Sequence, residues 1–168
     1  MNADMKIDRA TICHPNARGT GSAVRLALYP AHERTAGHIM LELARQKTTA
    51  SANGATPVFA TFDWENPIVA KLGLSELSQM IMVFRGMQES IEDGKGIFHR
   101  SATANSIIKF SHMIEPRPCY ALEISRKPFD GELESVTFAI RPEEAVWLCA
   151  AIEASMGILV FGVPSVNA

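Results

Sequence analysis

The sequence has little of what marks secreted, metal-binding and membrane proteins. It contains only three cysteines, Cys13, Cys119 and Cys149, an odd number without the spacing of a disulfide framework or a zinc site. No apolar leader opens the chain, and we find no run near the ~18 apolar residues of a membrane span. We therefore expect a soluble, cytoplasmic protein without disulfides and without a membrane partner.

Motifs for catalysis are also scarce. Cys13-His14, His32 and His38 do not have the spacing of a structural zinc site. Gly19-Thr-Gly21 lacks the Lys-Ser/Thr that ends a phosphate-binding loop, and it precedes a predicted strand rather than a helix. The sequence thus predicts no catalytic residue, no metal site and no cofactor, and we expect the protein not to be an enzyme.

A chain of 168 residues that is 47% hydrophobic and 20% charged is long enough for one domain with a buried core. Its net charge of −2 is unevenly distributed. Residues 9–49 and 94–127 each carry six basic and two acidic side chains, whereas residues 128–168 carry one basic and six acidic ones. This pattern is either ordinary variation in surface charge or a locally positive, strand-rich surface on a mildly acidic protein.

The chain repeats one pattern, short alternating strands followed by a helix. In the first strand Val24, Leu26 and Leu28 alternate with smaller or polar residues, a period of two that predicts a half-buried strand. Ser75 and the apolar spacing after it predict a helix. The predicted strands of this first pass are Ser22–Tyr29, His38–Ala44, Val58–Trp64 and Ile68–Leu72, and its helix is Ser75–Ser90.

The second pass has the same order, with strands predicted within residues 97–100, 106–114, 120–125 and 136–140. Pro142 suits the first position of the following helix, Pro142–Phe161. Because Val146–Phe161 is apolar on nearly all sides, we expect self-association to bury it. The predicted class is α+β, with two four-stranded antiparallel sheets that are each followed by a helix.

Several local motifs resemble those of the Whirly family of plant single-stranded-DNA-binding proteins, whose fold is shared by trypanosome mitochondrial guide-RNA-binding proteins. The similar segments are Phe62-Asp-Trp64, Leu72-Gly-Leu-Ser-Glu-Leu77, Ile97-Phe-His99, Glu134-Ser-Val136 through Arg141-Pro-Glu-Glu-Ala145, and Gly162. The resemblance implies a homotetramer, with helices packed at its centre and single-stranded nucleic acid lying along the sheets between neighbouring subunits. It covers roughly Ser22 to Gly162.

One family motif, Lys-Gly-Lys-Ala-Ala-Leu, is replaced here by Gly21-Ser-Ala-Val-Arg-Leu26. In the family this motif is tied to DNA binding and to assembly beyond the tetramer. Arg18 and Arg25 are the candidates to replace its positive charge, and assembly beyond the tetramer is left open. We divide the chain into a flexible N-terminal segment (residues 1–17), a single Whirly-like domain (18–162) and a C-terminal tail (163–168).

Single-strand binding requires cations for phosphates and aromatic faces for bases. The predicted phosphate contacts are Lys71, Arg100, Lys109, Arg126 and Lys127, and the predicted stacking residues are Phe62, Phe98 and His99. Phe62 is equally well interpreted as a core residue, Trp64 better as core than as a platform, and the lysines also fit a solvated face. The sequence therefore favours binding of single-stranded DNA, with an RNA-binding protein and an oligomeric protein-interaction scaffold as alternatives.

Overall fold

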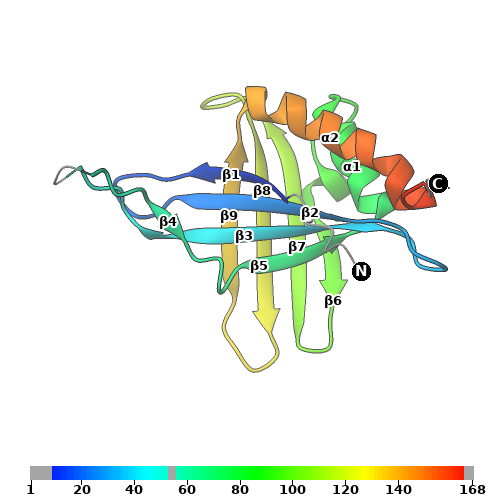
Figure 1. The fold of residues 1–168 in the computed structure, drawn as a ribbon, viewed down its shortest axis with the longest axis horizontal. Coiled ribbons are helices and arrows are strands. Elements are labelled where there is room, and N and C mark those ends of the chain that lie inside the picture. Colours follow the sequence, from blue (N-terminus) through cyan, green and yellow to red (C-terminus); the bar gives the residue numbers. More distant parts are fainter. Residues whose placement is uncertain (1–8, 53–55, 165–168) are drawn as a thin grey trace.

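The computed structural model describes residues 9–52 and 56–164, which form two antiparallel sheets and two α-helices (Figure 1). The first sheet has the strand order β1-β2-β3-β5, with the short β4 on the end of β3, and the second has the order β6-β7-β8-β9. This architecture confirms the predicted α+β class. The elements are β1 (Arg9–His14), β2 (Ser22–Tyr29), β3 (His38–Thr48), β4 (Thr61–Phe62), β5 (Ile68–Leu72), α1 (Leu74–Phe84), the 3₁₀ helix η1 (Ile91–Gly94), β6 (Ile97–Arg100), β7 (Ala104–Met113), β8 (Cys119–Pro128), β9 (Glu134–Ile140) and α2 (Pro142–Phe161).

The first sheet has a strand that the sequence pattern did not predict. β1 pairs with β2 from Arg9↔Ala27 to His14↔Ser22, inside the segment 1–17 that was expected to be flexible; residues 1–8 lie outside the described part of the chain. The alternation of β1 is weak because Ile12 is the only large apolar residue among its six. Pairing with β2 therefore stabilises a strand that its own sequence hardly indicates.

Two predicted boundaries were too long. The strand expected over Val58–Trp64 is reduced to β4, because its pairing with β3 shifts register between Gln46 and Thr48. The helix expected to reach Ser90 ends at Phe84. Gly86 has a φ of +68°, in the left-handed region, and a right-handed helix cannot continue through that conformation.

The core lies between the inner faces of the two sheets, whose strands run crosswise, and beneath the two helices (Figure 1). Alternation along each strand sends every second side chain into this core. Fully buried members include Leu41, Leu43 and Ile68 of the first sheet, Ile108, Phe110, Leu122 and Phe138 of the second, and Leu77, Met80, Leu148 and Ile152 of the helices.

Helix α2 is fixed at both ends by other elements. At its start, one oxygen of Glu144 accepts a hydrogen bond from the Arg141 amide (2.9 Å), and the other lies 2.7 Å from Nε2 of His14 in β1. At its end, the amides of Ala31 and Gly37 in the β2–β3 connection donate to the carbonyls of Ile158 (3.2 Å) and Leu159 (2.8 Å). These bonds satisfy carbonyls that a helix end otherwise leaves without a partner.

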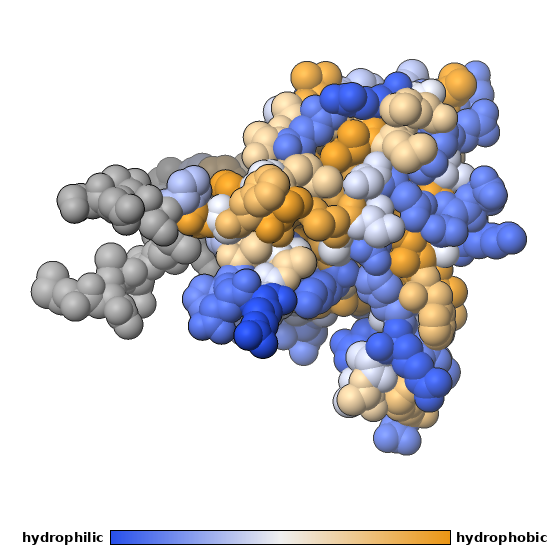
Figure 2. All heavy atoms as spheres, turned by 90° about the vertical axis from the view of Figure 1, so that its right-hand side faces the viewer, coloured by the Kyte–Doolittle hydropathy of each residue, from blue (hydrophilic) through white to orange (hydrophobic). Residues whose placement is uncertain are grey.

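The outward side of α2 is apolar. Val146 (73%), Trp147 (42%), Val160 (46%) and Phe161 (87%) remain exposed in the single chain. By length and composition alone, this helix is long and apolar enough to cross a membrane, which the sequence expectation did not anticipate. Figure 2 shows apolar side chains at the surface on the side where α2 ends.

Candidate nucleic-acid interface

A cleft of about 790 Å³ separates β5 of the first sheet from β6 and the neighbouring ends of β7 and β8. Five of the eight residues predicted to bind nucleic acid line it, although they come from three different strands. These five are Lys71, Phe98, His99, Arg100 and Arg126. The fold thus brings together cations and aromatic rings that lie up to 55 positions apart in the chain.

Strand register explains why His99, Ser106 and Arg126 face this cleft. Phe98 and Arg100 have the opposite alternation in β6 and border the cleft from the edge of the sheet. Ile97, Ile108 and Ile124 form one row across β6, β7 and β8 on the inner face of the second sheet, and Ile108 and Ile124 are fully buried. Two residues further along, the same face carries His99, Ser106 and Arg126. The inner face therefore changes from apolar to polar where it extends past the core.

Lys71 reaches the cleft from the other sheet. It is exposed between the buried Ala70 and Leu72, and its strand partner is Met40 of β3. His38, on the same face of β3, stacks on Tyr29 with ring centroids 4.9 Å apart. Burial lowers the pKa of His38, and the nearby ammonium group of Lys71 lowers it further.

The cleft is electropositive. Within residues 9–52 and 56–164, Lys71, Arg100 and Arg126 have no carboxylate within ion-pair distance. Among the described residues, the acidic member of the lining is Glu76, and its contacts lie within the site: one oxygen accepts from the Gly73 amide (3.0 Å), and the other lies 3.5 Å from Nε2 of His99. Three cations without a partner form an attractive site for phosphate groups.

The aromatic part of the site lies on an open edge. In the part of the chain that the structure describes, β6 pairs with β7 alone, so it forms one edge of the second sheet, and its Phe98 is 59% exposed. An exposed ring beside cations offers a surface on which a base can stack. The geometry thus combines phosphate contacts with a stacking surface.

Comparison with solved structures identifies the fold. WHY1 from Arabidopsis thaliana superposes with a TM-score of 0.73 over 92% of this chain and 86% of its own, at 15% identity. The plant transcriptional regulator PBF-2 gives 0.68, at 16% identity over 91% of this chain and 82% of its own. A guide-RNA-binding protein complex bound to a guide RNA gives a TM-score of 0.60, at 14% identity over 90% of this chain and 91% of its own.

The chain has the Whirly fold. This result confirms the resemblance seen in the sequence at the level of architecture. No family model matches the sequence. No curated protein matches it either.

The other three predicted residues lie outside the cleft of this Whirly fold. Lys109 is exposed on the outer face of the second sheet, opposite Glu123. Lys127 is on the same face, and its Nζ donates to the carbonyl of Gly131 (2.6 Å). Phe62 is half-buried in β4, at the other end of the first sheet from Lys71.

The sequence interpretation placed Trp64 in the core, and the structure does not. Trp64 is half-buried outside the core cluster, and the guanidinium carbon of Arg25 lies 3.7 Å from the centroid of its ring. The alternation of Arg25 with Val24 and Leu26 did indicate that it points outward. Nothing local indicated that Trp64, 39 positions later, would meet it.

Proposed function

We propose that this protein binds single-stranded DNA, with little sequence preference and as a homo-oligomer. The observation that carries the proposal is the cleft, in which Lys71, Arg100 and Arg126 have no carboxylate partner among the described residues and lie beside Phe98 and His99. Phosphate attraction by the cations and stacking on an aromatic face are the two components of sequence-tolerant single-strand binding. Duplex DNA does not offer free base faces to such a site.

The Whirly fold supports this proposal, because one solved neighbour is a guide-RNA-binding protein complex bound to its RNA. That neighbour also makes RNA the second candidate ligand. Free thiols at Cys13, Cys119 and Cys149 are consistent with the reducing, cytoplasmic location that we propose with it.

The oligomer is supported by α2. Exposed residues recur every three or four positions along α2 at Val146, Ala150, Ala154, Gly157 and Phe161, and its large exposed apolar side chains lie near its two ends. These residues would be covered if the helices of several subunits packed together. We propose a homotetramer on this basis, as the family resemblance implies.

Fluorescence anisotropy with labelled single-stranded DNA, duplex DNA and RNA at two salt concentrations tests the ligand. We expect single-stranded DNA to bind best and its affinity to fall as salt rises. The triple variant K71A/R100A/R126A should lose on the order of tenfold or more in affinity at low salt. A plot of the logarithm of the binding constant against the logarithm of the salt concentration should also become less steep, its slope changing by about 2. Each of the three lost phosphate contacts on a single strand contributes about 0.7 to that slope.

The variant R117A is the matched control, because Arg117 is exposed in the β7–β8 connection, at the far end of the second sheet from the cleft. It should bind like the wild type. A loss of log affinity in R117A equal to about one third of the loss in the triple variant would show that only overall charge matters, and it would contradict the cleft. Tighter binding of RNA would replace DNA as the ligand, and no binding of any nucleic acid would favour the protein-interaction scaffold.

A further inference from the structure

We propose that Trp64, supported by Arg25, is a second base-stacking site for single-stranded nucleic acid, on the outer face of the first sheet and outside the cleft. This proposal rests on the proposed function. It assigns a specific role to a residue that the sequence placed in the core.

The Arg25–Trp64 pair is built as a rigid platform. The Arg25 guanidinium lies over the indole ring, and its Nη1 is 3.2 Å from Oε2 of Glu42, the residue directly opposite it in β3. Both charged side chains are largely shielded from solvent, with 20% and 18% exposure. Because Glu42 already neutralises Arg25, this arginine supports the ring on one face rather than serving as a phosphate contact.

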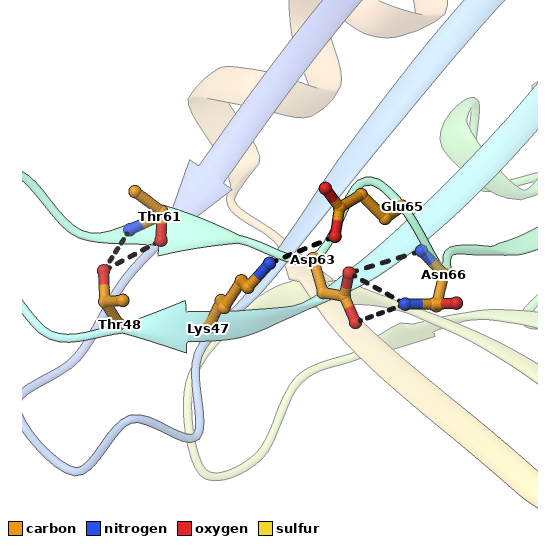
Figure 3. A network of polar contacts seen from close by, with 6 residues as sticks. All are labelled: Lys47, Thr48, Thr61, Asp63, Glu65 and Asn66. Atoms are coloured by element: carbon orange, nitrogen blue, oxygen red, sulfur yellow. Dashed lines mark hydrogen bonds and ion pairs between the residues drawn. The ribbon is translucent and has the colours of Figure 1, made fainter.

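The turn that carries Trp64 is also fixed. The Asp63 amide donates to the Arg45 carbonyl (2.8 Å), and the Asp63 carboxylate accepts from the backbone and side-chain nitrogens of Asn66. Lys47 pairs with Glu65 at 3.2 Å, as Figure 3 shows. A ring held in place before binding loses little conformational entropy when a base stacks on it.

The platform lies next to the cleft on a continuous surface. Arg25, Glu42 and Val69 form one row across β2, β3 and β5, and Val69 itself lines the cleft. Lys71 follows two residues later, so the α-carbons of Arg25 and Lys71 are about 12 Å apart. A strand that leaves the cleft across β5 passes the exposed Val69 and reaches the indole.

A purely structural role makes a different prediction. Ala23 and Ala44 are fully buried on this same outer face. In a purely structural role, the function of Trp64 is to shield these two residues from water. Loss of Trp64 would then lower stability and leave nucleic-acid affinity unchanged. The two roles are therefore separable by experiment.

The test uses the fact that the chain has only two tryptophans. In the variant W147F, Trp64 is the sole source of tryptophan fluorescence. We expect its emission to be quenched when an oligothymidylate of about 16 nucleotides binds. In a separate anisotropy titration, W64L should weaken binding of this oligomer by about 5- to 150-fold, and W64F should restore part of the loss.

An oligomer of about 4 nucleotides, short enough for the cleft alone, should bind W64L and the wild type equally. Binding of the long oligomer without quenching, together with unchanged affinity in W64L, would overturn the platform and leave the proposed function intact. Absence of any anisotropy change with single strands in the wild type would overturn both. W64L that retains the circular dichroism spectrum and short-oligomer affinity, yet loses long-oligomer affinity, supports the proposal.

Discussion

At the scale of single residues, one buried amide organises the connection between β1 and β2. Gln46 is 8% exposed, and its Oε1 accepts from the amides of Asn16 (2.9 Å) and Gly21 (3.0 Å). Its Nε2 donates to the carbonyls of Asn16 and Thr48. This side chain therefore satisfies backbone groups that no strand pairing reaches.

Replacing Gln46 by Leu should destabilise the protein by about 2–4 kcal/mol, because buried amides and carbonyls would lose their partner. Chemical denaturation measures the change. Q88L is the matched control. Among the described residues the half-buried Gln88 side chain makes one hydrogen bond, to the Gln79 carbonyl, and its loss should cost about 1 kcal/mol. Equal effects of the two substitutions would contradict this account of the β1–β2 connection.

At the scale of elements, a polar link joins the two helices. Arg85, after the end of α1, has its Nε 2.7 Å from Oε1 of Glu153 in α2. The Cys149 thiol, one turn earlier in α2, donates to the same oxygen at 3.5 Å. Burial, followed by the hydrogen bond and charge of Glu153, raises the pKa of Cys149 to about 11.

The raised pKa should make Cys149 slow to react with iodoacetamide. At pH 9 a thiol of ordinary pKa 9.0 is half ionised, whereas a pKa of about 11 leaves about one thiolate in a hundred. In E153Q the hydrogen bond and the negative charge that favour the protonated thiol are lost, so the pKa of Cys149 should fall and its alkylation should accelerate severalfold.

Mass spectrometry of the alkylated peptides provides both readouts. Cys13 in β1 is the internal control, and its rate should not change in E153Q. If the Cys149 rate also stays constant, Glu153 does not control this thiol.

At the scale of the whole molecule, the exposed apolar side of α2 bears on the oligomeric state. It packs Leu148, Ile152 and Leu159 into the core, yet it leaves its outward stripe uncovered. Such a surface needs either other subunits or a lipid phase. We favour subunits because α2 is held at both ends by the same domain.

Light scattering on V146D/F161D tests this. Both residues are largely exposed in the single chain, so the domain should keep its circular dichroism spectrum, while its mass should fall from that of a tetramer toward that of a monomer. L133D is the control, because Leu133 is 67% exposed in the β8–β9 connection. A monomeric wild type, or a wild type that sediments with phospholipid vesicles, would contradict the tetramer.

The sequence by itself determined the two sheets and two helices. Alternation at Ser22–Tyr29 and the apolar run after Pro142 are local signals, and β2 and α2 form where their own residues favour them. β1 and the early end of α1 were harder to predict from the sequence. β1 depends on its pairing with β2, and the end of α1 depends on the backbone conformation at Gly86.

Only the tertiary structure decided what the outward residues do. Lys71 and Arg126 were both recognisable as exposed cations, yet only the crossing of the sheets places them on one cleft and leaves Lys109 and Lys127 on another face. The contact between Trp64 and Arg25 likewise depends on how distant segments pack together. Local periodicity fixes which way a side chain points within its strand, whereas the partner that it meets depends on long-range packing between strands.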